Sequence, residues 1–436
     1  MDPDKALGAW MGMAAGDALG QAGKGLKPEA IRQLYKHLDT YQDVRPFIGK
    51  GVKSYRMKGL YGWQTQLALA LAESMGQKKG VDAAAFGDLL VRMSVGGPEF
   101  YFGVFRRPEG VFARSVMEFA SRVNPEAADF ATVFGSFFPA GITPALYFGK
   151  DSATFREAVS CAGRMWSSHP WEQAGTAAAG FLVQALAREK SEYGQARLPG
   201  AGAVIGRVAE QVREFEQRYC SSPETGGPAD AVSRTLLGLA ARFDGSTGEE
   251  LEQWIVENAN SFLKQPINHA AQGQVLSLLP LAVVLVLGQT DGFDPALARS
   301  AEKGREAVKL GTLAGALAGA LYGWGAMGNA LKVDLVNHKE VKNRGEALLK
   351  RRAPAAGKDL IAMEMGLTRK EAEEGRKTLP KAPKKSTEPP PLTKKQLFED
   401  LGVEWEDDPL AEIRDNPRLR RQFEKDKTRK KRDRRH

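Results

Sequence analysis

Two stretches of the chain, Gly8–Gly20 (GAWMGMAAGDALG) and Gly311–Gly323 (GTLAGALAGALYG), carry a glycine at every fourth residue. Positions i and i+4 share one face of an α-helix, so glycines there leave a groove that another backbone can approach closely. Glycine in a helix interior costs about 0.5–1 kcal/mol relative to alanine. Four in a row therefore predict tight packing, and we expect Gly16 and Gly315 to face neighbouring helices in the core.

The second stretch also has to be weighed as a membrane span. Residues 310–331 carry no charge over a length that could cross a bilayer. They consist mostly of Gly and Ala, which are weakly hydrophobic, and the rest of the chain is polar. The apolar run Val275–Leu287 is too short to span and contains Pro280. We therefore predict helix packing and no membrane partner.

Cysteine and histidine usage excludes several kinds of site. The 436 residues include two cysteines, Cys161 and Cys220, and five scattered histidines. This set cannot form a disulfide framework, and no Cys/His cluster has the spacing of a zinc site. Hydrophobic residues make up 42% of the chain, which suffices for a packed core. Because the N-terminus also lacks a signal-peptide pattern, we predict a cytoplasmic protein.

The positive charge is concentrated at one end of the chain. Residues 337–436 hold 28 Lys and Arg against 19 Asp and Glu, while residues 1–336 hold 34 of each, so the tail carries the whole net charge of +9. This shift predicts a neutral domain over 1–336 and a charged, Pro-containing extension over 337–436 that is partly helical and largely disordered. The stretch Leu379–Pro391 is typical of a disordered linker.

The end of this basic tail suggests one class of partner. Its last ten residues, Lys427–His436, include seven Lys and Arg. Such a cluster attracts polyphosphates because each neutralised phosphate releases counterions. It lacks the interleaved aromatic residues on which single-stranded bases could stack. We expect either weak, sequence-independent nucleic-acid contact through the C-terminal tail or a solvated tail without a partner.

Helical periodicity dominates the neutral domain, and convincing alternating strands are absent. Apolar residues recur at three- and four-residue spacing, which is typical of amphipathic helices. The predicted helices are 63–75, 81–93, 112–123, 173–189, 203–218, 231–243, 249–262, 275–287 and 296–321, with a further short helix over 359–375. Gly- and Pro-rich segments, such as Phe134–Pro144, are expected to connect them. The sequence thus predicts a compact all-α domain.

Three isolated features leave two explanations open, and for a fourth, Asp17, we expect a local role. The basic glycine segments Gly23–Lys27 and Gly49–Ser54 are either anion-binding loops or solvated turns. His169 precedes a predicted helix, and it is either a hydrogen-bonded structural residue or a catalytic one. Asp17 follows Gly16, and we expect its carboxylate to cap a helix or bond backbone within its groove.

Further landmarks follow the first glycine stretch in a fixed order: YGWQTQL at Tyr61–Leu67, Phe137–Pro144, Ser168-His169-Pro170 and AGALAGALYG at Ala314–Gly323. Together with the opening GxxxGxxxGDALG, they resemble the ADP-ribosylglycohydrolases, which include the dinitrogenase-reductase-activating glycohydrolases. The resemblance covers about residues 5–330. It implies a compact orthogonal helical bundle. In active members, two Mg²⁺ or Mn²⁺ ions lie between two aspartate motifs, and an N- or O-glycosidic bond of ADP-ribose is hydrolysed.

This chain departs from the family at both of those motifs. The positions of the four aspartates hold Trp63, Gln64, Glu306 and Val308. Thr65 is kept in the first motif, whereas Lys309 replaces the last threonine of the second. Hard divalent cations need several carboxylate oxygens. We therefore predict that the metal pair is lost and that the protein has no cofactor.

The leading hypothesis is a pseudoenzyme of this family, a binding or scaffolding protein that lacks the two-metal site. The resemblance implies a relic cleft that holds an ADP-ribosyl group, a nucleotide or no ligand, and its expected residues are Asp17, Trp63, Gln64, Thr65 and His169. One alternative is an active hydrolase with metal-independent chemistry, in which Glu306 or Glu172 is the general base. The other is a nucleic-acid-associated protein that acts through its basic tail.

Overall fold

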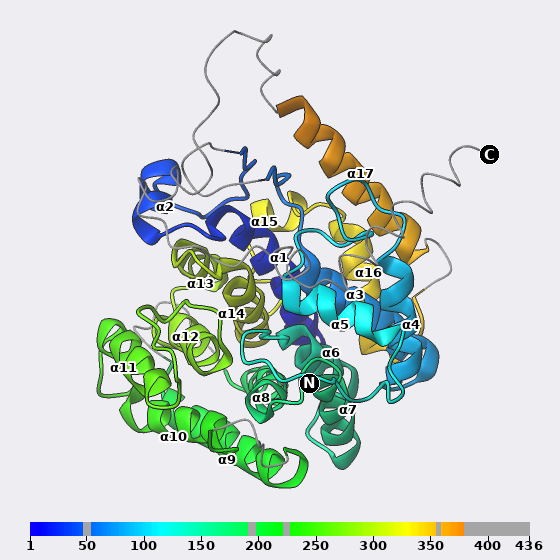
Figure 1. Ribbon diagram of the computed structural model, residues 1–436. Coiled ribbons are helices and arrows are strands. Elements are labelled where there is room, and N and C mark those ends of the chain that lie inside the picture. The colour runs from blue at the N-terminus through cyan, green and yellow to red at the C-terminus, as the bar shows by residue number, and fades with distance from the viewer. Residues whose placement is uncertain (47–53, 191–197, 221–226, 355–358, 379–436) are drawn as a thin grey trace, which may run out of the picture.

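The computed structural model describes residues 1–46, 54–190, 198–220, 227–354 and 359–378. Within them the regular secondary structure is helical, and extended pairing is limited to isolated bridges (Figure 1). The prediction of an all-α fold is confirmed. The helices are, in chain order, α1 (Pro3–Gly23), α2 (Pro28–Tyr35), α3 (Trp63–Lys78), α4 (Ala83–Met93), α5 (Gly110–Phe119), α6 (Phe138–Phe148), α7 (Ala153–Arg164), α8 (Pro170–Leu186), α9 (Ala201–Tyr219), α10 (Ala231–Phe243), α11 (Gly248–Asn260), α12 (Val275–Leu287), α13 (Phe293–Glu302), α14 (Ala307–Tyr322), α15 (Asn329–Val333), α16 (His338–Leu349) and α17 (Leu360–Thr378).

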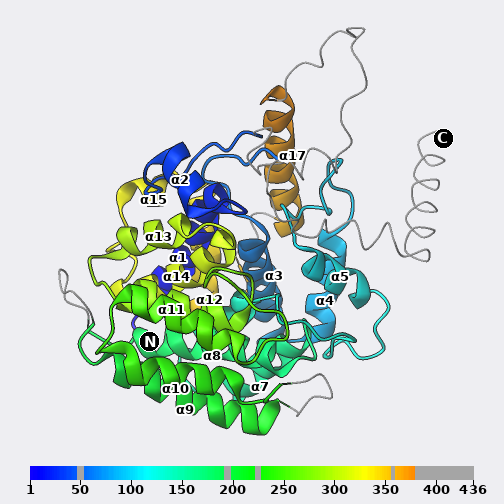
Figure 2. The ribbon, with the colours of Figure 1, turned by 60° about the vertical axis from the view of Figure 1, so that its left-hand side comes forward.

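The two glycine stretches pack against each other as the central pair of helices, α1 and α14 (Figures 1 and 2). The helices are antiparallel, and the facing pairs are Gly8 with Gly319, Gly12 with Gly315, and Gly16 with Gly311. A Cβ added at Gly16 would lie 1.8 Å from the Gly311 carbonyl oxygen. No side chain fits between the backbones, so the expectation that Gly16 and Gly315 face neighbouring helices is confirmed.

The other helices form layers around this pair. On one side α6 and α8 pack on α14 and on each other, and α9 and α10 follow outside α8, while α12 and α13 also pack directly on α14. Every residue of the apolar helix α12 is buried among its neighbours. In the part of the chain that the structure describes, no helix combines the length and hydropathy needed for a membrane crossing.

In two of the segments that differ from the sequence prediction, backbone geometry and burial override local composition. The single helix expected over 296–321 is two helices, since Gly304 and Arg305 adopt positive φ values of 65° and 50°. This break pairs with the turn after α1, where the Arg305 N–H donates to the Leu26 carbonyl at 2.8 Å. The expected connection Phe134–Pro144 is helical from Phe138, because α6 is buried against α8.

Packing on the body continues past the boundary expected after Val336. α16 contacts α1 and α3, and the Trp10 Nε1–H donates to the Val341 carbonyl at 2.7 Å. α17, which corresponds to the helix expected over 359–375, packs against α3. The Pro-rich linker and the basic end of the tail lie outside the described residues.

Replacing Gly315 by alanine should destabilise the fold, because the new Cβ would lie 2.0 Å from the Gly12 carbonyl oxygen. Overpacking of this kind costs about 1–3 kcal/mol or more. Gly366 is the matched control, since it lies inside α17 with nothing within 4 Å of an added Cβ. Gly366→Ala should raise the free energy of unfolding by about 0.5–1 kcal/mol. Urea unfolding measures both, and equal stabilities of the two variants would contradict the packing.

Candidate functional site

Asp17 fixes the first turn of α3. Its Oδ1 accepts from the Gly62 N–H at 2.9 Å and from Gln21 Nε2 at 2.7 Å, while Oδ2 accepts from the Thr65 N–H at 2.9 Å and the Thr65 hydroxyl at 2.8 Å. The carboxylate is fully buried. It satisfies backbone donors that a helix N-terminus otherwise leaves free. Asp17 and Thr65 thus lie together, and their contacts hold the residues between Gly62 and Thr65 in place.

Those intervening residues, Trp63 and Gln64, are buried with polar atoms unused. The Trp63 ring packs on Phe112 and Phe137, at centroid distances of 4.8 and 5.8 Å. Neither Trp63 Nε1 nor the two polar atoms of Gln64 has a hydrogen-bond partner among the described residues. A buried polar group left unpaired costs about 1–3 kcal/mol. These three atoms are therefore unsatisfied within the fold, at a cost to its stability.

A buried ammonium lies at the position of the second metal motif. Lys309 Nζ is 2.5 Å from Glu109 Oε2, 3.4 Å from Glu306 Oε2 and 2.7 Å from the Phe134 carbonyl oxygen. Burial acts to lower the pKa of Lys309, but Glu109 and Glu306 raise it above its usual value. Burial also acts to raise the pKa of Glu306, but Lys309 and Lys24 bring this pKa below its usual value. The cluster is therefore an ionised lysine between carboxylates.

The loop 134–137 joins this cluster to Glu172. Glu172 Oε1 accepts from the Gly135 N–H at 3.0 Å and its Oε2 from the Ser136 N–H at 2.9 Å. Burial raises the pKa of Glu172 to about 7, against the opposing effects of Lys309 and the backbone donors. The next residue of the loop, Phe137, contacts Trp63. Trp63, Glu172 and Lys309, which are far apart in the sequence, thus all contact one loop.

His169 begins α8 and has a structural set of contacts. Its Nδ1 accepts from the Trp171 N–H at 3.2 Å, and its ring packs on the Trp171 ring at 4.8 Å. Burial lowers the pKa of His169 to about 4, so the imidazole is neutral near pH 7. Within the described part of the chain, its ring makes no hydrogen bond or ion pair with Trp63, Gln64 or Lys309.

The residues at the two metal motifs do not fit a pair of divalent cations. Across the described ranges, no group of three or more His, Cys, Asp or Glu side chains is placed to bind a metal ion. The carboxylates nearest to the second motif, Glu109 and Glu306, already face the ammonium of Lys309. At the first motif, the side chain of Trp63 is an aromatic ring that packs on Phe112 and offers no oxygen ligand.

Glu109 is the one member of the cluster that the sequence analysis missed. It precedes α5 and lies between the ammonium groups of Lys309 and Lys24, which is 3.5 Å away. In the sequence it follows Arg106-Arg107-Pro108 and belongs to no motif. Only the fold brings it to α14, so no local pattern could have indicated its role.

The comparisons with known proteins agree with this architecture. The model of the ADP-ribosylglycohydrolase family matches residues 2–357. The chain therefore belongs to the ADP-ribosylglycohydrolase family. Among solved structures, a chain of an "ADP-ribosylglycohydrolase-related protein complex" matches with a TM-score of 0.53 at 19% identity, over 80% of this chain and 98% of that one. That likeness shows a shared fold. No curated protein matches the sequence.

Glu172→Gln should weaken the dependence of stability on pH. The pKa of Glu172, about 7 in the fold, lies above its usual 4.5, so between these values the native state keeps a proton that the unfolded chain has released. The free energy of unfolding then falls as pH rises through this window, by on the order of 3 kcal/mol, and is flat outside it.

Urea unfolding across this pH range measures the effect. Glu216→Gln is the matched control, because burial also raises the pKa of Glu216 to about 7 and this residue lies away from the cluster, beside α10. Each variant should remove its own part of the pH dependence. If Glu172→Gln keeps the full dependence of the unmodified protein, Glu172 is not protonated in the fold.

Proposed function

We propose that this chain is a pseudoenzyme of the ADP-ribosylglycohydrolase family that binds an ADP-ribosyl group or a nucleotide without a metal pair. One observation carries the proposal: the Lys309 ammonium lies between Glu109 and Glu306, at the second metal motif. A lysine there supplies positive charge permanently, whereas a metal ion supplies it only when bound.

The ammonium also opposes metal binding. Two unit charges 4 Å apart interact by about 4 kcal/mol at an effective dielectric constant of about 20, so a divalent ion at that distance from an ammonium is repelled by about 8 kcal/mol. The carboxylates that could offset this repulsion are already paired with Lys309. This balance supports a site that works without Mg²⁺ or Mn²⁺.

The unpaired polar atoms of Trp63 and Gln64 support ligand binding. The Gln64 amide offers two donors and an acceptor, and Trp63 Nε1 offers another donor. An amide of this kind can pair with the edge of an adenine or with ribose hydroxyls. Since an unsatisfied buried group is costly, a ligand that pairs with it gains affinity and discriminates against analogues that cannot.

A calorimetric titration with Mn²⁺ should detect no stoichiometric binding to the unmodified protein. In Lys309→Met, which removes the ammonium but keeps the length of the side chain, Glu109, Glu306 and Glu172 lose their shared counter-charge. Manganese affinity should then rise, because carboxylates are what hard cations bind. Tight binding by the unmodified protein would contradict the proposal. If Lys309→Met does not bind manganese more tightly, the ammonium is not what prevents metal binding.

ADP-ribose should raise the melting temperature, while no product of hydrolysis accumulates. A ligand at 100 times its dissociation constant adds about 2.7 kcal/mol of stability, which a thermal-shift assay detects readily. Gln64→Ala should lose this shift, and Gln184→Ala is its control, because Gln184 is a buried glutamine of α8 that donates to the Ala145 carbonyl. An equal shift in Gln64→Ala would place the ligand elsewhere, and no shift with ADP-ribose or ATP would count against binding.

One observation favours the second candidate, a metal-independent hydrolase. A carboxyl group with a pKa of about 7, as burial gives Glu172, is well matched to general acid–base work near neutral pH. If the same assay detects turnover, its pH–rate profile should show an apparent pKa near 7 that Glu172→Gln abolishes. Such a result would show that the protein is a metal-independent hydrolase and would contradict the pseudoenzyme proposal.

A further inference from the structure

α17 supplies the carboxylates that pair with the two arginines preceding α5. Glu364 Oε2 lies 2.6 Å from Arg106 Nη2, and Glu371 Oε2 lies 2.7 Å from Arg107 Nη1. The helix runs along the edge of the body and lies beyond residues 2–357, which match the family (Figure 2). In these two ion pairs the arginines thus come from the part of the chain that matches the family, and the carboxylates come from α17.

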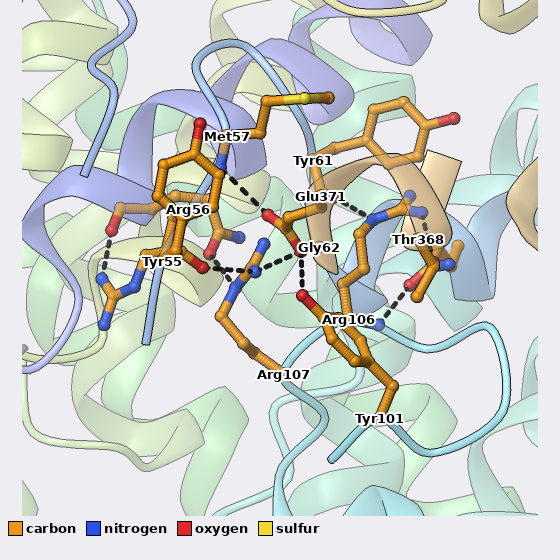
Figure 3. A network of polar contacts seen from close by, with 12 residues as sticks. Tyr55, Arg56, Met57, Tyr61, Gly62, Tyr101, Arg106, Arg107, Thr368 and Glu371 are labelled. Atoms are coloured by element: carbon orange, nitrogen blue, oxygen red, sulfur yellow. Dashed lines mark hydrogen bonds and ion pairs between the residues drawn. The ribbon is translucent and has the colours of Figure 1, made fainter. Parts of the chain in front are cut away.

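The Glu371 carboxylate is held by three donors from two segments of the body, one before α3 and one before α5 (Figure 3). Oε1 accepts from the Met57 N–H at 3.0 Å, while Oε2 accepts from Arg107 Nη1 at 2.7 Å and from the Tyr101 hydroxyl at 3.2 Å. Burial acts to raise the pKa of Glu371, but Arg107, Arg106 and the Met57 N–H together bring it below its usual value. A guanidinium, a hydroxyl and a backbone N–H converging on one point are suited to bind an oxyanion.

The site has more donors than one carboxylate uses. Arg107 Nη2 and Arg56 Nε are buried and have no hydrogen-bond partner among the described residues. The two guanidinium groups flank Gln21: Arg107 Nε donates to its side-chain oxygen at 3.1 Å, and Arg56 Nη1 donates to its backbone oxygen. Burial, with the nearby charge of Arg107 as the next cause, lowers the pKa of Arg56 to about 10. An anion with more oxygens and more charge than a carboxylate could also use Arg107 Nη2.

Polar contacts contribute much of what holds α17 in place. Its buried side chains are Leu360, Glu364, Thr368 and Glu371, of which only the first is apolar. Further apolar residues, among them Ile361 and Met365, are only partly covered. Apolar burial is what normally fixes a helix on a body, whereas an ion pair can be exchanged for another anion of suitable shape.

We propose that Met57 N–H, Tyr101 and Arg107 form an oxyanion site that a phosphate group can take from Glu371, releasing α17 from the body. Phosphate fits better than a carboxylate because it carries more oxygens and more charge, and Arg107 Nη2 is a donor of this site that Glu371 leaves unused. The proposal is independent of whether a ligand binds beside Gln64, since the site stands on its own residues.

The first test uses the unmodified full chain and hydrogen exchange. Inorganic phosphate at ten times its dissociation constant for the uncovered site raises the population of detached α17 about tenfold. Exchange of the backbone amides over 360–378 should accelerate accordingly, while exchange in α14 stays constant. Sodium chloride at equal ionic strength is the control. If phosphate and chloride give the same exchange over 360–378, the proposal is wrong.

The second test is chemical rescue of a vacated site. Glu371→Ala should lower the melting temperature, because the three donors lose their acceptor, and phosphate should restore it. Glu364→Ala is the matched control: it also removes a buried carboxylate of α17, but its partner Arg106 is fully buried whereas Arg107 is partly exposed, so phosphate should not restore this variant. In Glu371→Ala combined with Arg107→Ala, rescue should be lost.

Rescue of Glu364→Ala or of the double variant to the same extent would show a general salt effect and overturn the proposal. Rescue by acetate alone would overturn the assignment to phosphate. If Glu371→Ala does not fold, the exchange of 360–378 in the unmodified protein decides the question by itself.

Discussion

The backbone contact between α1 and α14 is the constraint on which the other features depend. Glycines every fourth residue let the two helices meet without intervening side chains, so that Gly16 lies against Gly311. Asp17 follows the first of these residues directly, and Lys309 precedes the second by two positions. The close approach therefore fixes both the carboxylate that holds the first turn of α3 and the ammonium that faces Glu109. A wider helix pair would move these groups apart.

Charge is balanced locally in two separate layers. Around Lys309, carboxylates from the segment before α5 and from the start of α14 enclose one ammonium. Around Arg106 and Arg107, the balancing carboxylates come from α17. Buried ion pairs are costly to form but still more costly to break on one side, because the remaining partner is left unpaired. An added cation is thus repelled around Lys309, whereas an added anion finds hydrogen-bond donors around Arg107.

Periodic features could be predicted from the sequence, whereas features set by distant contacts could not. The glycine spacing and most helices follow from residue patterns, and so does the contact of Asp17 with backbone donors. The break at Gly304 was missed because it depends on pairing with the turn after α1. Glu109 and the α17 carboxylates belong to no motif, and only the fold brings them to their partners. The resemblance to the family pointed to Trp63, Gln64, Lys309 and the landmark that begins at Phe137, but not to the way in which the loop 134–137 connects Trp63 and Lys309.

The central claim is that the Lys309 ammonium occupies the place of a metal ion. Anomalous diffraction at the manganese absorption edge, from crystals grown with an excess of Mn²⁺, tests it most directly because it locates bound manganese without reference to activity. The account predicts no anomalous peak among Glu109, Glu306 and Glu172, and Lys309 Nζ within hydrogen-bonding distance of Glu109. A strong peak between these carboxylates, with the lysine side chain turned away, would contradict it.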